Sequence, residues 1–395
     1  MSDYMFMLES HLSSEQNHIV AQVEAAAGLA GLQVFLSGGA MRDMLGGFPI
    51  RDIDFTVEGS PAKLLKILQH DAGAVLLATG ESHKTVELLF PNHTPVEIRS
   101  AHVARYSRPG SKPQIQAATI QEDLRQRDFT INSIALSLNR SSRGLLLDPT
   151  NGLADLERRE LRANSNYALY DDPSRILRMF RFQTRMGFSL DPRLQQQYDN
   201  VRLAKLESRI PAKALLAELR AMAGEPYPVL LLETLEREKL LALYSPALQA
   251  QRLNTSGFSK LEKARQSIPF GVDFRVDNFS LFCYLLAERL TPEDRSAMAQ
   301  HLGMSQQEAD SWRQLEVRAR QLESALKSPR LNRASLVYKA LHAEPGELIL
   351  FLLLRSGQRL VTDRIKNFLY KYLPAAHEIR DRSEERRVGK ECRSR

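Results

Sequence analysis

The stretch Leu36-Ser-Gly-Gly-Ala-Met-Arg-Asp43, with Arg51-Asp-Ile-Asp-Phe55 shortly after it, decides the fold of the amino-terminal part. Val34–Ser37 is a short apolar run that predicts a β-strand, and Gly38-Gly39 separates it from a predicted helix start. Glycines between a strand and a helix let backbone N–H groups approach a phosphate closely, and the helix N-terminus adds partial positive charge. The stretch therefore predicts an α/β unit that can bind phosphate.

Asp52 and Asp54 are the candidate metal ligands. The alternating pattern of residues 52–57 predicts a strand, and residues two apart on a strand share a face. Two carboxylates there offer the oxygen ligands that Mg²⁺ prefers. A two-metal site aligns a hydroxyl with a phosphorus atom and stabilises leaving pyrophosphate. A lone Gly-Gly or Asp-x-Asp is usually an ordinary turn or strand, so the interpretation depends on their combination.

These segments and three later ones resemble the motifs of class II tRNA nucleotidyltransferases (CCA-adding enzymes) and the related bacterial poly(A) polymerases, members of the DNA polymerase β-like superfamily. The later segments follow in the family's order: Asp123-Leu-Arg-Gln-Arg-Asp-Phe-Thr-Ile-Asn132, Leu147-Asp-Pro-Thr-Asn-Gly-Leu-Ala-Asp-Leu156 and Asp171-Asp-Pro-Ser-Arg-Ile-Leu-Arg-Met-Phe-Arg-Phe182. The resemblance implies an α/β head with a mixed sheet and helices, followed by an all-α neck, body and tail.

The chain of 395 residues is long enough for two to four domains. We expect a nucleotidyltransferase head over residues 1–140, a helical neck with the base-selecting motif over 141–205, and a helical body and tail that bind tRNA over 206–382. Residues 383–395 are highly charged and without periodicity, and we expect them to be non-native or disordered. Residues 105–118 read as a mobile loop, and the pattern from about residue 120 onward reads as almost entirely helical.

The resemblance implies roles for residues of the first two motifs. Asp52 and Asp54 would bind the metal ions, with Glu97 as the candidate third carboxylate and Glu87 as its competitor. Gly38, Gly39 and Arg42 would help to hold the triphosphate. Arg127, Asp128 and Asn132 would surround the sugar and phosphates of the nucleotide. A purely structural alternative for Asp128 is a helix N-cap with a salt bridge.

In the fourth motif, Asp172 and Arg175 lie three residues apart at a predicted helix start, so they share a face. Asp offers acceptors and Arg offers donors in a fixed fork. In the family this pair selects CTP and then ATP by reading the edge of the base, and Arg178 would line the same pocket. The family usually begins this motif with Glu, where this chain has Asp171. The alternative is an ordinary salt bridge in the first helical turn.

Charge is distributed unevenly. The net charge is +7, but residues 1–140 carry 12 basic and 15 acidic residues, whereas residues 141–395 carry 42 and 32. A basic helical surface suits tRNA, because double-stranded RNA is recognised largely by shape and backbone. The two cysteines fit a reducing compartment. Neither a signal peptide nor a membrane span is predicted, so we expect a cytoplasmic location, without membrane or protein partners.

The resemblance leaves the product open. Full CCA-adding members carry an Asp-x-x-Arg element in a flexible loop between the first two motifs, and residues 105–114 lack it. The chain could therefore add CCA, only CC or only the terminal A to tRNA, from CTP and ATP. A poly(A) polymerase and a tRNA-binding protein with a degenerate site are further alternatives, as is a small-molecule nucleotidyltransferase. The intact Asp52 and Asp54 argue against a degenerate site.

Overall fold

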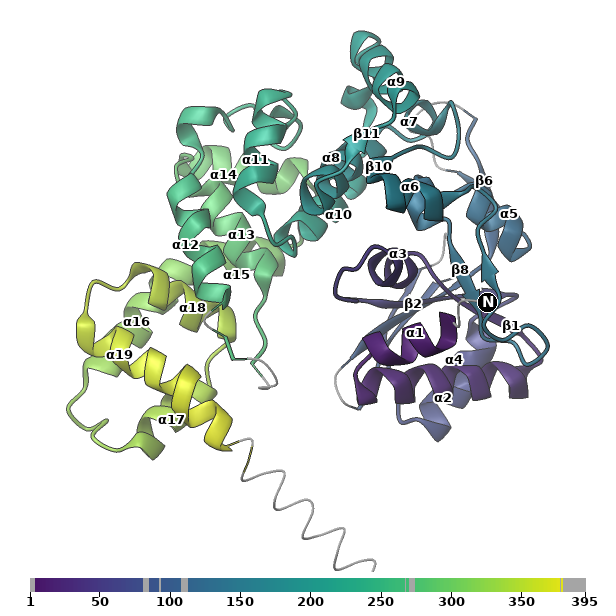
Figure 1. Cartoon of the computed structure of the whole chain (residues 1–395). Coiled ribbons are helices and arrows are strands. Elements are labelled where there is room, and N and C mark those ends of the chain that lie inside the picture. The colour runs from purple at the N-terminus through teal and green to yellow at the C-terminus, as the bar shows by residue number, and fades with distance from the viewer. Residues whose placement is uncertain are drawn as a thin grey trace, which may run out of the picture. The chain divides into compact units, whose positions relative to one another are not determined.

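The computed structural model describes residues 4–80, 85–91, 94–107, 113–266, 268–269, 274–376 and 378. They form two compact units, with the first ending at Ile210 and the second beginning at Pro211 (Figure 1). This division lies close to the predicted start of the body at residue 206. The further division of the first unit into head and neck stays a prediction, and residues 383–395 with Cys392 lie outside the described residues.

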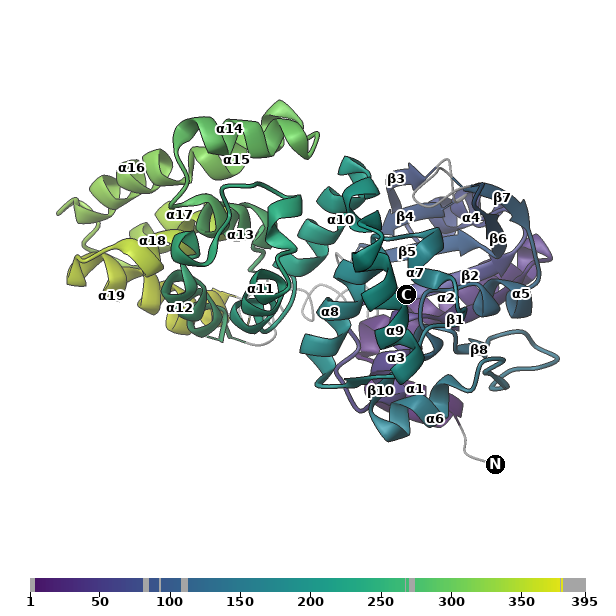
Figure 2. The same cartoon turned by 90° about the horizontal axis from the view of Figure 1, so that it is seen from above.

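A seven-stranded mixed sheet organises the first unit. Its strands are β1 (Gln33–Ser37), β2 (Ile53–Glu58), β3 (Val75–Gly80), β4 (Thr85–Leu89), β5 (Pro95–Ser100), β8 (Ala135–Ser137) and β9 (Leu146–Leu147). They lie in the order β3-β4-β5-β2-β1-β8-β9 (Figure 2). The strands β2 and β5 run parallel, while β1 is antiparallel to both of its neighbours. The buried side chains of β2 and β5, among them Phe55 and Ile98, belong to the core of this unit.

The first unit also contains nine described helices, of which the second to fifth along the chain pack against strands of this sheet. They are α1 (Tyr4–His11), α2 (Ser14–Ala30), α3 (Gly39–Leu45), α4 (Ala62–Asp71), α5 (Ile120–Arg125), α6 (Gly152–Arg158), α7 (Ala168–Asp171), α8 (Arg175–Met186) and α9 (Pro192–Leu203), with 3₁₀ turns η1 (Thr130–Asn132) and η2 (Leu206–Arg209). The helix α2 begins with a capping box at Ser13 and packs against β1 and α4. The helix α3 follows β1 directly, which places its first turn at the end of a central strand.

The second unit is helical. Its helices are α10 (Ala212–Ala223), α11 (Pro228–Arg237), α12 (Thr255–Gln266), α13 (Asn278–Ala287), α14 (Pro292–His301), α15 (Gln306–Arg313), α16 (Leu315–Lys327), α17 (Ala334–His342), α18 (Gly346–Arg355) and α19 (Arg359–Asn367), with short turns η3 (Leu241–Leu243) and η4 (Ala250–Arg252) and a π-helical turn η5 (Phe368–Tyr372). Large buried side chains such as Phe258, Phe282 and Trp312 fill its core. Helices α16, α18 and α19 pack against one another (Figure 1).

The predicted fold class is confirmed, with two local corrections. Part of the segment predicted as a loop is the strand β7 (Gln114–Ala117), which pairs with β6 (His102–Arg105), although residues 108–112 lie outside the described residues. The region beyond residue 120 is not entirely helical, because it contributes β8 and β9 to the sheet and a small parallel pair, β10 (Glu160–Leu161) and β11 (Ser189–Leu190). No helix within the described ranges is long and apolar enough to span a membrane.

Candidate active site

Gly38, between β1 and α3, and Gly39, the first residue of α3, lie directly against Asp54. Gly38 has a φ of 69°, a conformation that favours glycine. A Cβ at Gly38 would lie 3.3 Å from Arg127 Nη1 and 3.9 Å from Asp54 Oδ2, and one at Gly39 would lie 3.4 Å from the same oxygen. The turn therefore brings the backbone of both glycines close to this carboxylate, while the N–H of Gly38 donates to the carbonyl of Ile134 at 3.3 Å.

A row of carboxylates crosses three strands of the sheet. The register places Asp54 on β2 opposite Glu97 on β5, and Glu97 opposite Glu87 on β4. Burial raises the pKa of Asp54 to about 7, and the charges of Glu97 and Asp52 add to this rise. Burial likewise raises the pKa of Glu97. A cation bound here would offset this repulsion between carboxylates.

Asp52 and Asp54 fit a hard cation whose remaining ligands are water and substrate phosphates. Asp52 is exposed and lies one residue before β2, and Asp54 is half-buried at its start. Among the residues that the structure describes, no three His, Cys, Asp or Glu side chains group closely enough to hold a metal ion. Mg²⁺ is commonly bound by one or two carboxylates, with water and substrate phosphates as the other ligands. The donor set agrees with that pattern.

Arg42 points into the protein. Its Nε donates to Asp43 Oδ1 at 2.9 Å, and its Nη1 donates to Asn132 Oδ1 at 2.8 Å. Its guanidinium also lies over the ring of Phe182, 4.7 Å from the centroid. Burial lowers the pKa of Arg42, and Asp43 opposes that shift. The structure thus shows Arg42 as a buried link between α3 and the second motif, whereas the sequence suggested a ligand of the triphosphate.

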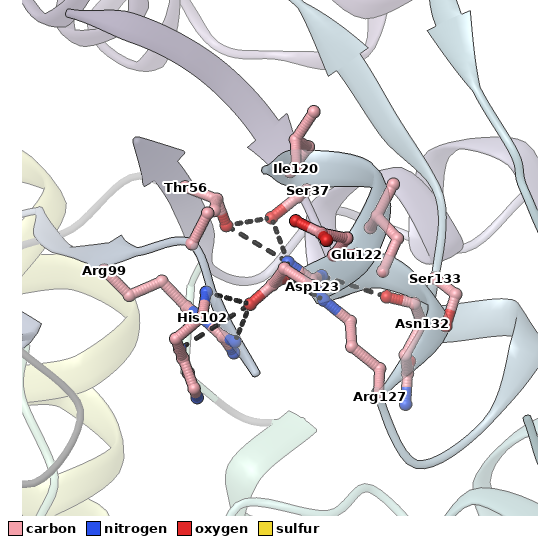
Figure 3. A network of polar contacts seen from close by, with 12 residues as sticks. Ser37, Thr56, Arg99, His102, Ile120, Glu122, Asp123, Arg127, Asn132 and Ser133 are labelled. Carbon is pink, nitrogen blue, oxygen red and sulfur yellow. Dashed lines mark hydrogen bonds and ion pairs between the residues drawn. The ribbon is translucent and has the colours of Figure 1, made fainter. Parts of the chain in front are cut away.

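Arg127 forms the centre of a second buried network, which Figure 3 shows. Its Nε and Nη2 both donate to Asp123 Oδ2, at 3.0 Å and 2.8 Å, and its Nη1 donates to the carbonyl of Asn132. Its Nη2 also lies 3.1 Å from the hydroxyls of Ser37 on β1 and Thr56 on β2. Arg127 therefore ties the second motif to the strands that carry the glycine turn and the metal ligands.

Asp128 is buried, and both of its oxygens are engaged. Its Oδ1 accepts from the backbone N–H of Phe129 at 2.8 Å and from Asn132 Nδ2 at 2.9 Å, and its Oδ2 pairs with Arg178. Burial opposes ionisation, but Arg178 and Arg175 hold the pKa of Asp128 at about 2. Asp128 is therefore ionised at neutral pH and acts only as an acceptor. Asn132 lies in a 3₁₀ turn rather than an α-helix.

Asp172 and Arg175 lie side by side at the junction of two helices. Asp172 directly follows α7, Arg175 begins α8, and Arg175 Nε lies 3.9 Å from Asp172 Oδ2. The hydroxyl and backbone N–H of Ser174 donate to Asp172 Oδ1, at 2.6 Å and 3.1 Å. One oxygen of Asp172 is thus held by Ser174, and the other faces Arg175. This arrangement presents an acceptor and a donor side by side.

The third motif makes structural contacts with the start of α6 and with η1. Asp148 accepts from the backbone N–H groups of Gly152 and Leu153 at the start of α6. A Cβ at Gly152 would lie 2.2 Å from the carbonyl oxygen of Thr130, so only glycine allows α6 to approach η1 this closely. Asp155 accepts from the Thr130 hydroxyl and from Arg162. These contacts hold the second motif against α6.

Four residues near the site were not among the predicted ones. Asp123 precedes Arg127 by four residues, and Arg185 follows Arg178 by seven. Each spacing is a signal that the two side chains share a helix face. Ser174 follows an Asp by two residues, a spacing typical of Asx turns. Tyr106 gave no signal, because it comes from the segment read as a loop. Burial raises the pKa of Tyr106, a hydrogen bond to Arg175 opposes that rise, and Tyr106 is therefore a neighbour of the fourth motif.

Comparisons with known proteins agree with the motifs. The family model described as poly A polymerase head domain matches residues 34–162. The chain is similar to the A-adding tRNA nucleotidyltransferase of Aquifex aeolicus, with 28% identity over 86% of this chain and 40% of that protein. It is also similar to the CC-adding tRNA nucleotidyltransferase of Deinococcus radiodurans, with 34% identity over 50% of this chain and 51% of that protein. The chain thus spans about half of these relatives, or less.

The fold has counterparts among solved structures. An apo form of a CCA-adding enzyme superposes with a TM-score of 0.60 and 22% identity, over 93% of this chain and 85% of that one. At this identity the likeness concerns the fold alone. It confirms the predicted α/β head followed by helices, and the head-domain match and the two relatives agree with the family resemblance.

Proposed function

We propose that this chain, which carries a poly(A) polymerase head domain over residues 34–162, adds CCA or part of it to the 3′ end of tRNA in the cytoplasm. The observation that carries the proposal is the glycine turn packed against Asp54, with the sugar and base candidates of the second and fourth motifs linked to the same turn. The tRNA 3′-hydroxyl would attack the α-phosphorus of CTP or ATP, and the bond to pyrophosphate would break.

Asp52 and Asp54 would hold the divalent metal ions, Mg²⁺ in our proposal, with Glu97 as a possible third carboxylate. When bound, the metal supplies positive charge against the reacting phosphate and the leaving pyrophosphate. Gly38 and Gly39 would accept the triphosphate close to their backbone. Arg42 contributes by holding the helix that follows them, through Asp43 and Asn132.

Asp128 would accept from a ribose hydroxyl of the nucleotide. It is ionised and fixed in orientation by Asn132 and Arg178. A site built for that hydroxyl discriminates against deoxynucleotides, because its buried polar groups lose a partner when the hydroxyl is missing. Asp172 and Arg175 would read the base, the first accepting from an exocyclic amino group and the second donating to ring acceptors.

Addition of only CC or only A is the second candidate function. It is favoured by the missing Asp-x-x-Arg element in residues 105–114, and the relatives include proteins named for each partial activity. Poly(A) synthesis remains an alternative that the head-domain match does not separate from tRNA addition.

A primer-extension assay tests these functions. It offers tRNA that ends at the discriminator base, at C or at CC, with CTP, ATP or both, and we expect nucleotides to be added to at least one of these ends. Growth of the first substrate by three nucleotides indicates CCA addition, and growth of only the CC-ended tRNA indicates A addition. Long A tails on unrelated RNA would show a poly(A) polymerase instead. No incorporation into any substrate would reject the proposal.

Arg175→Ala is expected to relax base choice. The preference for CTP or ATP over UTP and GTP, measured as a ratio of kcat/KM values, should fall by about a hundredfold, because a site that loses its hydrogen bonds to the base loses most of its discrimination. Arg193→Ala, which removes an exposed arginine at the start of α9, is the matched control and should keep the ratio. Unchanged selectivity in the Arg175 variant would defeat the base-reading role.

A further inference from the structure

Six buried or half-buried side chains from α3, η1, α8 and Asp128, which lies two residues before η1, form a chain of five polar contacts whose two ends both lie on α8, and we call this chain the ring. In order around the ring they are Arg185, Asp43, Arg42, Asn132, Asp128 and Arg178. The ring closes because Arg178 and Arg185 both belong to α8, seven residues apart. Asp43 and Arg185 have no contact with the nucleotide in the reaction proposed above, yet the ring joins them to the sugar-reading candidate Asp128.

In the half of the ring far from Asp128, two arginines hold the carboxylate of Asp43 in place. Arg185 Nη2 donates to Asp43 Oδ2 at 2.6 Å, while Arg42 Nε donates to Asp43 Oδ1 at 2.9 Å. The side chain of Arg185 is 7% exposed and that of Asp43 is 3% exposed. Each oxygen of this buried carboxylate thus has its own arginine. Removing one arginine leaves a buried oxygen without its charged donor, which is costly in a place that water does not reach.

Asn132 links Arg42 to Asp128. Its Oδ1 accepts from Arg42 Nη1 at 2.8 Å, and its Nδ2 donates to Asp128 Oδ1 at 2.9 Å. An arginine can only donate and a carboxylate can only accept, so the amide has one orientation that satisfies both neighbours. A rotated amide would set its NH₂ against Arg42 and its oxygen against Asp128. Arg42 and Asp128 together therefore determine which way Asn132 faces, and Arg42 fixes the position of the amide oxygen.

Phe182 supports the ring from within α8. Its aromatic face lies against Arg42 at 4.7 Å and against Arg178 at 5.5 Å, and only 3% of the residue is exposed. Because Phe182 lies between Arg178 and Arg185 in the helix, a shift of α8 would move both ends of the ring together. The ring thus couples the register of α8 to the orientation of the Asp128 carboxylate.

We propose that Arg185 and Asp43 are positioning residues for the recognition of the nucleotide sugar. The inference rests on the proposed nucleotidyl transfer. It adds two residues that influence the selectivity for ribose without touching the sugar themselves. Arg185 holds Asp43, Asp43 holds Arg42, and Arg42 orients Asn132, which presents Asp128 to the ribose hydroxyl. Without Arg185, Asp128 keeps its charge, its pair with Arg178 and its bond from the Phe129 N–H, but its contact with Asn132 is less well fixed.

The test compares ribonucleotides with deoxyribonucleotides. The quantity measured is the ratio of kcat/KM for CTP over dCTP, and for ATP over dATP, together with the matching ratio of dissociation constants from calorimetry. A partly unfolded variant lowers both members of a pair equally, so the kcat/KM ratio is insensitive to a loss of folded protein. We expect Arg185→Met to lower the kcat/KM ratio about tenfold. This is only part of the discrimination that a hydroxyl-binding site provides, because Asp128 itself remains. Arg185→Lys should restore part of it.

Arg202→Met is the matched control. Arg202 on α9 also pairs with a carboxylate, Glu207, at 2.8 Å, and neither residue belongs to the ring. The Arg202→Met variant should have the same ratio of kcat/KM for ribonucleotide over deoxyribonucleotide as the wild type. Asp43→Asn, which keeps the shape of the side chain, is the second variant if Arg185→Met does not fold, and its ratio should also fall.

The outcomes separate this inference from the proposed function. Wild-type ratios in folded Arg185→Met and Asp43→Asn proteins overturn the positioning role while incorporation by the wild type stands. If the wild type binds CTP or ATP in preference to the deoxy forms but incorporates neither, the proposed reaction fails and the binding ratios still test the ring. A wild type without any preference for ribonucleotides overturns the inference as well.

Discussion

Replacing Asp54 with asparagine is expected to lower nucleotide incorporation by about a thousandfold or more while leaving the protein at least as stable as the wild type. The activity falls because asparagine is a poor ligand for Mg²⁺, and the loss of metal-based charge stabilisation is worth several kcal/mol at the transition state. Stability does not fall, because the Asp54 carboxylate is disfavoured by burial and by Glu97 and Asp52 in the absence of a cation.

The measurements are single-turnover incorporation with saturating tRNA and the Tm in metal-free buffer. Because asparagine has nearly the shape of aspartate and carries no charge, we expect the Tm of the variant to equal or exceed that of the wild type. Adding Mg²⁺ should raise the Tm of the wild type more than that of the variant, since the folded wild type binds the ion more tightly. Binding of tRNA should stay within about twofold, because the proposed tRNA surface lies elsewhere.

Glu58→Gln is the matched control for Asp54→Asn. Glu58 ends the same strand, β2, and its carboxylate accepts from the backbone N–H of Ile120 at 2.7 Å. Glutamine retains an acceptor for this N–H group, and the substitution does not touch the glycine turn at Gly38 and Gly39. Incorporation should therefore stay within about threefold of the wild type. Full activity of Asp54→Asn in the same assay would defeat the assignment of the metal ligand.

The sequence predicted the parts of the site that depend on local spacing. Gly38 and Gly39 lie between a strand and a helix as expected, and Asn132 reaches Asp128 across four residues. Asp172 and Arg175 also meet as their spacing indicated. In each case the two partners are close in the chain, so backbone geometry alone brings them together.

Contacts between distant segments could not be predicted in this way. The resemblance suggested Arg42 as a ligand of the triphosphate, but its side chain is buried and donates to Asn132, 90 residues later. The strands β7 and β8 were missed because each is short and owes its conformation to a partner strand, β6 and β1 respectively. Pairing of this kind overrides the local signals of Gln, Ser and Asn in these segments.

Asp123→Asn is expected to destabilise the first unit by about 3–5 kcal/mol, because removing one member of a buried ion pair leaves the other charge uncompensated. The Asp123 carboxylate is 1% exposed. Its Oδ1 accepts from Arg99 Nη2 at 2.8 Å, and its Oδ2 accepts twice from Arg127 (Figure 3). An asparagine must set its NH₂ group against one of these guanidinium groups, which are donors only. We expect the Tm to fall by about 10 °C.

The pH dependence identifies the cause of that loss. Burial opposes ionisation of Asp123, but Arg127 and Arg99 together hold its pKa below the ordinary value of 3.8. A carboxylate with a lowered pKa stabilises the fold fully above its unfolded-state pKa and loses that contribution as the pH falls through the folded-state pKa. The difference in unfolding free energy between wild type and variant should therefore be constant from about pH 5 to 8 and shrink below about pH 4.

Glu24→Gln provides the comparison for Asp123→Asn. Glu24 pairs with Arg143 at 3.1 Å, but both side chains are partly exposed, at 28% and 45%. Such a pair contributes less than about 1 kcal/mol, so its Tm should stay within about 3 °C of the wild type. A change in Asp123→Asn no larger than in this variant would show that Asp123 does not hold the second motif to the sheet. A difference that persists unchanged at pH 3 would assign the loss to shape and not to charge.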